Sequence, residues 1–146
     1  MKAFVVDAST SLKWIFSDEE NALIARKILY NYLEKKITLV APSLWLYEVS
    51  NGINSAQLSG RISFKKAQNL LSLIMRAKPH LFSIESTISK CLFNSNKYKI
   101  SVYDSSYITL AQENEVGLIS SDRKLTSKFE NISNLVIPLE NFHFSK

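Results

Sequence analysis

Apolar residues recur along this chain in two patterns. Five short runs, rich in β-branched and aromatic residues, are typical of buried strands. These runs occupy residues 3–6, 37–40, 80–82, 117–120 and 134–139. Longer segments carry apolar residues at helical spacing, with polar residues between them. The pattern predicts helices over residues 18–36, 42–58, 63–77, 86–97 and 103–115.

Strands that alternate with helices indicate a mainly parallel sheet covered by helices on both faces. We therefore expect an α/β fold with three layers, α/β/α. The chain has 146 residues, without internal repeats or a linker, and this length suits one domain over residues 1–146. In open α/β sheets, ligands bind beyond the carboxyl ends of the strands. That edge is where functional side chains are expected.

Composition narrows the setting. The single Cys91 allows neither an internal disulfide nor a cysteine zinc site. No apolar run is long enough to span a membrane, and the N-terminus lacks the layout of a signal peptide. We therefore expect a cytoplasmic protein. The formal net charge of +5 favours polyanions such as nucleic acid, although a merely soluble basic protein would have the same charge.

Four acidic residues interrupt or end apolar segments, where carboxylates are uncommon. They are Asp7, Glu48, Asp104 and Asp122. Two like charges about 4 Å apart repel by roughly 4 kcal/mol at an effective dielectric of 20. If the fold gathers these side chains, they must therefore take up protons or hold a cation. We expect Asp7 and Asp122, which both follow strands, to share one edge of the sheet.

Each acid also has a purely structural explanation. Asp7 and Asp122 can cap the helices that follow them, and Asp104 fits a capping box that begins at Ser101. Glu48 shares a helical face with small and polar residues, including Asn51, and that face can point to solvent or line a cleft. The functional interpretation depends on the four acids together.

Other charged residues have weaker interpretations. The acidic run 18–20 is explained as the start of the helix predicted over 18–36, where acids favour the helix dipole. Trp14 and Trp45 are expected in the core. Several basic residues lie near the candidate site in the sequence and are possible phosphate contacts: Lys13, Arg61, Lys97, Lys99, Arg123 and Lys124.

The motifs around the four acids, in this order, resemble those of PIN-domain nucleases. The matching segments are Val6-Asp7-Ala8-Ser9, Glu48-Val49-Ser50-Asn51, Tyr103-Asp104-Ser105-Ser106-Tyr107-Ile108-Thr109-Leu110-Ala111, and Leu118-Ile119-Ser120-Ser121-Asp122-Arg123-Lys124-Leu125. Ser105 stands where the family usually has alanine, and Ser120 where it usually has threonine. The resemblance covers essentially the whole chain. Its length and closing strand look like those of VapC toxins from VapBC toxin–antitoxin pairs.

The resemblance implies a PIN-like fold and a metal-dependent endoribonuclease that uses Mg²⁺ or Mn²⁺. Asp7 and Asp104 would bind metal, with Glu48 and Asp122 binding directly or through water. Ser9, Asn51 and Ser120 would orient these ligands. It also implies a VapB-type antitoxin as partner and a toxin homodimer.

A different class of function remains open, because the same fold can serve as a non-catalytic module that binds RNA or protein. A phosphoacceptor signalling domain is a further α/β alternative. It would require paired acids near the first strand, whereas Asp7 stands alone.

Overall fold

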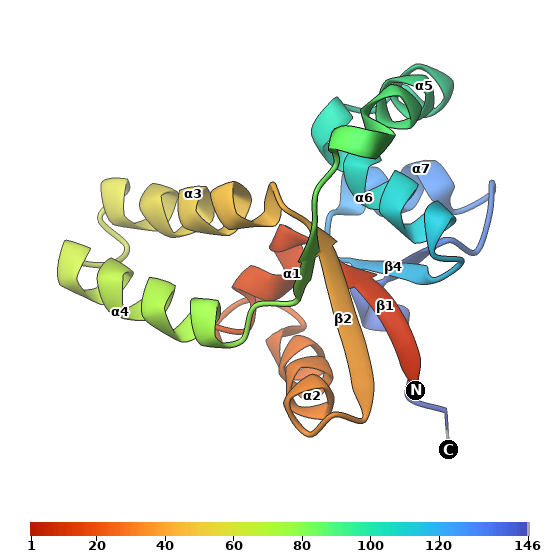
Figure 1. Ribbon diagram of the computed structural model, residues 1–146. Coiled ribbons are helices and arrows are strands. Elements are labelled where there is room, and N and C mark those ends of the chain that lie inside the picture. The colour runs from red at the N-terminus through yellow and green to blue at the C-terminus, as the bar shows by residue number, and fades with distance from the viewer. Residues whose placement is uncertain (146) are drawn as a thin grey trace.

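The computed structural model describes residues 1–145 and is built around one five-stranded sheet (Figure 1). All strand pairs are parallel, in the order β3-β2-β1-β4-β5. The strands are β1 (Lys2–Val6), β2 (Ile37–Pro42), β3 (His80–Phe82), β4 (Gly117–Ser120) and β5 (Val136–Pro138). All five strands predicted from the sequence are therefore present, and the expected parallel sheet is confirmed.

Seven α-helices surround the sheet in the described residues, with 3-10 turns at Glu85–Thr87 (η1) and Leu139–Asn141 (η2). The helices are α1 (Ala8–Leu12), α2 (Ala22–Leu33), α3 (Trp45–Leu58), α4 (Phe64–Arg76), α5 (Ile88–Tyr98), α6 (Val102–Glu113) and α7 (Arg123–Phe129). Figure 1 shows α2 and α6 on opposite sides of the sheet, as expected for a three-layer α/β/α sandwich.

The core forms where the central strands meet α6. Val5 and Val6 of β1 have no exposed surface, and neither has Ile119 of β4. The middle of α6, from Ser105 to Thr109, is buried, because α6 packs against β1, β2 and β4 and is covered by α5. Trp45 is fully buried and donates its indole N–H to Ser11 Oγ at 2.9 Å. The predicted core position of both tryptophans is confirmed, since Trp14 is also buried.

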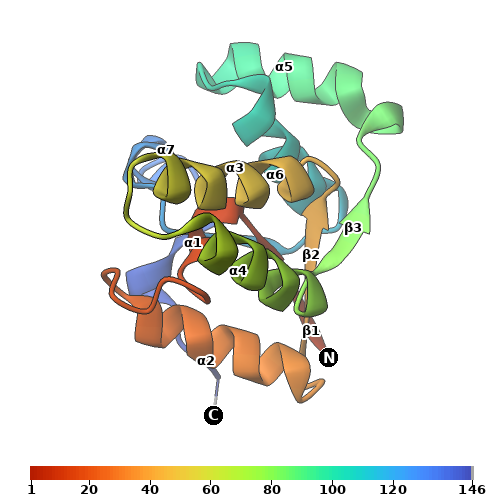
Figure 2. The ribbon, with the colours of Figure 1, turned by 90° about the vertical axis from the view of Figure 1, so that its left-hand side faces the viewer.

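Two groups of helices extend away from the sheet, namely the pair α3 and α4, and helix α5. Figure 2 shows α3 and α4 as an antiparallel pair, and α5 lies above α6 with one side uncovered. Ile88, Leu92 and Phe93 of α5 are exposed apolar side chains. No helix in residues 1–145 is long and apolar enough to cross a membrane.

The prediction for the acidic run 18–20 is wrong. Helix α2 begins only at Ala22, because Asn21 adopts a left-handed backbone (φ 63°) that separates the run from the helix. The first turn of α2 contains no acid, so helix-dipole stabilisation does not explain these residues.

Candidate active site

The site lies at the carboxyl ends of the two neighbouring strands β1 and β4. Val6 pairs with Ile119, so the residues that follow each strand emerge side by side at this edge. Asp7 directly follows β1, and Asp122 lies two residues beyond Ser120, the last residue of β4. The two aspartates therefore share the edge that the sequence predicted for them.

Asp7 is held almost out of solvent, with 6% of its surface exposed. Its Oδ1 accepts hydrogen bonds from Ser9 Oγ at 2.8 Å and from the Thr10 backbone N–H at 2.9 Å, and Ser120 Oγ donates to Oδ2. The Thr10 contact is the N-cap of α1, so the structural explanation of Asp7 is correct. The cap uses only Oδ1, so Oδ2 can accept the hydroxyl of Ser120, which belongs to β4.

Burial dominates the electrostatics of Asp7. Desolvation raises the pKa of this carboxyl above its ordinary value, although the donors on Ser120, Thr10 and Ser9 oppose the shift. Its ionised form is thus costly in the protein alone, and a nearby cation would lower that cost.

Glu48 lies in the first turn of α3 and is half-buried. Tyr107 of α6 donates its phenolic O–H to Glu48 Oε1 at 2.7 Å. Desolvation raises the pKa of Glu48, and the charges of Asp7 and Asp104 raise it further, while the Tyr107 hydrogen bond lowers it. Burial and Glu48 together raise the pKa of Tyr107, so the phenol stays a neutral donor.

Gly52 lets α3 approach α1 closely, one turn beyond Glu48. A Cβ at this position would lie 2.4 Å from Leu12 Cδ1, so no side chain fits without displacing Leu12. The polar stripe predicted on this helix therefore faces α1 at Gly52, whereas Asn51 is exposed to solvent.

Asp104 and Asp122 complete the group. Desolvation raises the pKa of Asp104, the charge of Asp122 raises it further, and the Ser101 hydrogen bond lowers it. Ser101 caps α6 by accepting from the Asp104 backbone N–H at 3.0 Å. Asp122 likewise caps α7, accepting from the backbone N–H groups of Lys124 and Leu125. Repulsion between like charges thus acts between successive pairs of these acids. The pairs are Asp7 with Glu48, Glu48 with Asp104, and Asp104 with Asp122.

No basic side chain neutralises this group. Among residues 1–145, none of the four acids forms an ion pair within 4.0 Å of a lysine, arginine or histidine. In the same residues, no three Asp, Glu, His or Cys side chains are arranged to hold one metal ion. The donor chemistry, all carboxylate oxygens, fits a hard divalent cation. The ligand set itself remains a prediction.

The three polar residues predicted to orient the acids differ in their positions. Ser9 and Ser120 both donate to Asp7. Asn51 is exposed and makes no hydrogen bond to the acids in the described residues. Sequence reasoning missed the contact from Tyr107 to Glu48, although Tyr107 shares a helical face with Asp104, and that spacing was the available signal.

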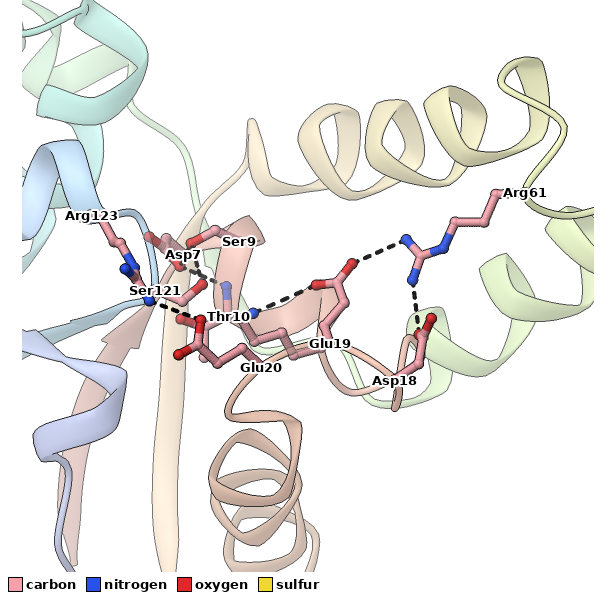
Figure 3. Close-up of polar contacts among 10 residues, drawn as sticks. Asp7, Ser9, Thr10, Asp18, Glu19, Glu20, Arg61, Ser121 and Arg123 are labelled. Atoms are coloured by element: carbon pink, nitrogen blue, oxygen red, sulfur yellow. Dashed lines mark hydrogen bonds and ion pairs between the residues drawn. The ribbon is translucent and has the colours of Figure 1, made fainter.

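The acidic run 18–20 contacts basic residues on both sides of the site, as Figure 3 shows. Arg61 binds Asp18 at 2.8 Å and Glu19 at 3.1 Å, and Arg123 binds Glu20 at 2.8 Å. Lys13 lies 3.6 Å from Glu19. Three of the basic residues considered as phosphate contacts are therefore already paired within the chain.

The family model that matches this chain is the PIN domain, over residues 4–131. Comparison with curated proteins found no match. Solved structures with a similar fold include PAE2754 from Pyrobaculum aerophilum, at 22% identity and TM-score 0.68, with 95% of this chain and 90% of that one covered. A toxin–antitoxin complex from Klebsiella pneumoniae has 16% identity and TM-score 0.56, covering 92% and 96% of the respective chains. VapBC2 from Rickettsia felis, bound to a DNA fragment from their promoter, has 12% identity and TM-score 0.62, with the same coverage of 92% and 96%.

Proposed function

Because the chain belongs to the PIN domain family, we propose that it is a metal-dependent endoribonuclease and the toxin of a type II toxin–antitoxin pair of the VapBC kind. One observation carries the proposal. Burial raises the pKa of Asp7, Glu48 and Asp104, the charges of Asp7 and Asp104 raise that of Glu48 further, and none of the three has a basic partner within residues 1–145. A divalent cation is the simplest way to stabilise such a group at neutral pH.

Asp7 and Asp104 would hold Mg²⁺ or Mn²⁺, with Glu48 and Asp122 binding directly or through water. When bound, the ion would supply an activated water and neutralise the scissile phosphate. The chain's own residues prepare this arrangement. Ser9, Ser120 and the Thr10 N–H fix the orientation of Asp7, and the Tyr107 hydroxyl fixes Glu48.

The first test is cleavage of single-stranded RNA with Mg²⁺ or Mn²⁺, with and without chelator. We expect Asp7→Asn and Asp104→Asn to lower the rate by at least about a hundredfold, because a lost metal ligand removes charge stabilisation of the transition state. Glu113→Gln, at the far end of α6, is the matched control. Full activity in either aspartate variant, or in chelator, contradicts the proposal.

A hollow of about 430 Å³ between α2 and α4 supports an antitoxin partner. Its walls include Leu33 and Leu73, both more than half exposed, and Arg26 and Arg76 stand on its rim. The Trp14 indole nitrogen is buried beside it without a hydrogen-bond partner in the described residues. An amphipathic, acidic segment of a VapB-type antitoxin would cover the leucines and pair with the arginines.

Replacing Leu33 tests this partner. We expect Leu33→Asp to prevent co-purification with a co-expressed VapB-type antitoxin, because it places a charge in the apolar hollow. Leu23→Asp is the control, since Leu23 lies on the same helix, is 78% exposed and does not line the hollow. Equal co-purification of both variants would assign the antitoxin to another surface.

We also propose a homodimer through the uncovered side of α5. Leu92 and Phe93 are each 65% exposed there, and Tyr103 at the start of α6 is 68% exposed. Exposed apolar side chains of this size are typical of protein interfaces.

The alternative is a non-catalytic module that binds RNA or protein. It would be favoured by wild-type protein that binds RNA in chelator but fails to cleave any RNA with either metal.

A further inference from the structure

A polar hollow of about 600 Å³ opens beside the candidate active site. Helix α7 forms one wall with residues spaced three, four and seven positions apart, so that one helical face lines it: Arg123, Thr126, Ser127 and Glu130. The opposite face of α7 is buried in the core through Leu125 and Phe129. The edge strand β5 and the turn η2 supply the other walls.

The hollow begins one residue beyond the last acid of the group. Arg123 lines it and immediately follows Asp122, which caps the same helix. Ser121, two residues before Arg123, donates to Ser9 Oγ at 3.1 Å, and Ser9 in turn donates to Asp7 (Figure 3). A chain of nucleotides whose phosphate lies at the acids would therefore reach the hollow with an adjacent residue.

The lining fits a base better than a phosphate. Glu130 and Glu140 would repel an anion, but their carboxylates accept hydrogen bonds from exocyclic amino groups. Asn134 and Asn141 add amide donors and acceptors, and neither side chain has a hydrogen-bond partner within residues 1–145. Ile137 and Pro138 offer an apolar surface for the flat face of the ring.

We propose that this hollow binds one base of single-stranded RNA next to the scissile bond, and that it selects a base with an exocyclic amino group. Arg123 contacts the phosphate between that base and the acids. The inference rests on the proposed function, because it takes RNA as the substrate. A volume of about 600 Å³ lies within the range of natural small-ligand sites.

Binding in chelator tests the inference without cleavage. The probes are fluorescein-labelled decamers of adenosine, cytidine or uridine, followed by fluorescence anisotropy with the full chain. We expect the adenosine or the cytidine decamer to bind at least about tenfold more tightly than the uridine decamer, which has no exocyclic amino group. A difference below twofold for both would overturn the inference.

A matched pair of double variants assigns the selectivity to the hollow. Glu130→Ala with Glu140→Ala removes both acceptors and should reduce the difference between decamers to below threefold. Glu113→Ala with Glu115→Ala, at the opposite edge of the sheet, makes the same change in net charge and should preserve it. Selectivity that survives in the first pair, or is lost equally in both, contradicts the assignment.

A second measurement covers the case of a poorly folded variant. Adenosine or cytidine monophosphate is titrated into isotope-labelled wild-type protein, and backbone amide shifts are recorded by NMR. The largest shifts are expected in residues 123–141. Largest shifts elsewhere reject the hollow. Base selectivity in a protein that never cleaves RNA would reject the nuclease but retain this site, whereas cleavage without selectivity would do the reverse.

Discussion

At the scale of single residues, one side chain serves both as a helix cap and as a member of the acidic group. Asp7 caps α1 through Oδ1, and its Oδ2 accepts a hydrogen bond from the Ser120 hydroxyl at the end of β4. Asp122 caps α7 and still raises the pKa of Asp104. The capping explanation of an acid therefore does not exclude a role in metal binding, because a carboxylate has about four acceptor positions.

Tyr107 provides a residue-scale prediction. Tyr107→Phe removes the only hydrogen bond that the Glu48 carboxylate accepts in the described residues, so the pKa of Glu48 should rise further. We expect the acidic limb of the rate–pH profile for RNA cleavage to move to higher pH, since Glu48 must be ionised to assist a metal. Stability should fall by about 1 kcal/mol. The pH profile of initial rates measures the first effect and urea unfolding the second.

The matched control is Tyr98→Phe on α5, which removes a hydroxyl away from the acids. An unchanged profile in Tyr107→Phe would show that Glu48 has no part in the rate-limiting ionisation.

At the scale of elements, the acidic loop before α2 pairs with basic side chains that a bound polyanion would otherwise contact. Its three acids pair with Arg61, Lys13 and Arg123. Arg61 also lies over the Phe16 ring at 4.4 Å, which fixes this side of the loop. The pair between Glu20 and Arg123 is highly exposed, so it contributes little stability and exchanges easily.

Glu20→Gln tests whether this loop competes with RNA. Freeing Arg123 should tighten binding of single-stranded RNA about two- to fivefold at low salt, and the gain should shrink at high salt because it is electrostatic. Anisotropy titrations in chelator at two salt concentrations measure both effects. Glu34→Gln, which removes an acid at the end of α2, controls for net charge. An equal gain in both variants would indicate a general charge effect.

At the scale of the whole molecule, the net charge of +5 is opposite in sign to the charge of the acidic group at the site. The excess positive charge favours a polyanion, while the acidic group repels phosphate until a cation neutralises it. RNA binding and metal binding should therefore support one another.

Global stability should report the acidic group directly. Burial raises the pKa of Asp7 above 3.8, so between that value and the raised pKa the folded state binds more protons than the unfolded state. The free energy of unfolding therefore falls as pH rises through this window. We expect Asp7→Asn to gain in Tm relative to wild type as pH increases above 4, without metal.

Added metal should reverse the order of the two Tm values, so that the wild type becomes more stable than Asp7→Asn. Millimolar Mg²⁺ or Mn²⁺ should raise the Tm of the wild type, because a ligand of the folded state stabilises it. The shift should be absent in Asp7→Asn. A wild-type Tm that does not respond to metal would count against a formed site, even where RNA cleavage is observed.

The sequence by itself determined the strands, because short apolar runs such as Phe4-Val5-Val6 and Gly117-Leu118-Ile119, alternating with longer helical segments, are typical of buried strands. It also placed Asp7 and Asp122 at one edge, since parallel strands end together. The helix from Ser63 was predicted almost to the residue, because a serine cap and strong amphipathicity are local signals.

Only the tertiary structure decided what each acid contacts. The run 18–20 reads as a helix start in isolation, but Arg61 and Arg123, far away in the sequence, draw these acids into a loop. The Tyr107 contact with Glu48 spans 59 positions, and the Ser120 contact with Asp7 spans 113. Local pattern sets which element a residue joins, whereas burial and charge at the site arise from elements that meet only in the folded chain.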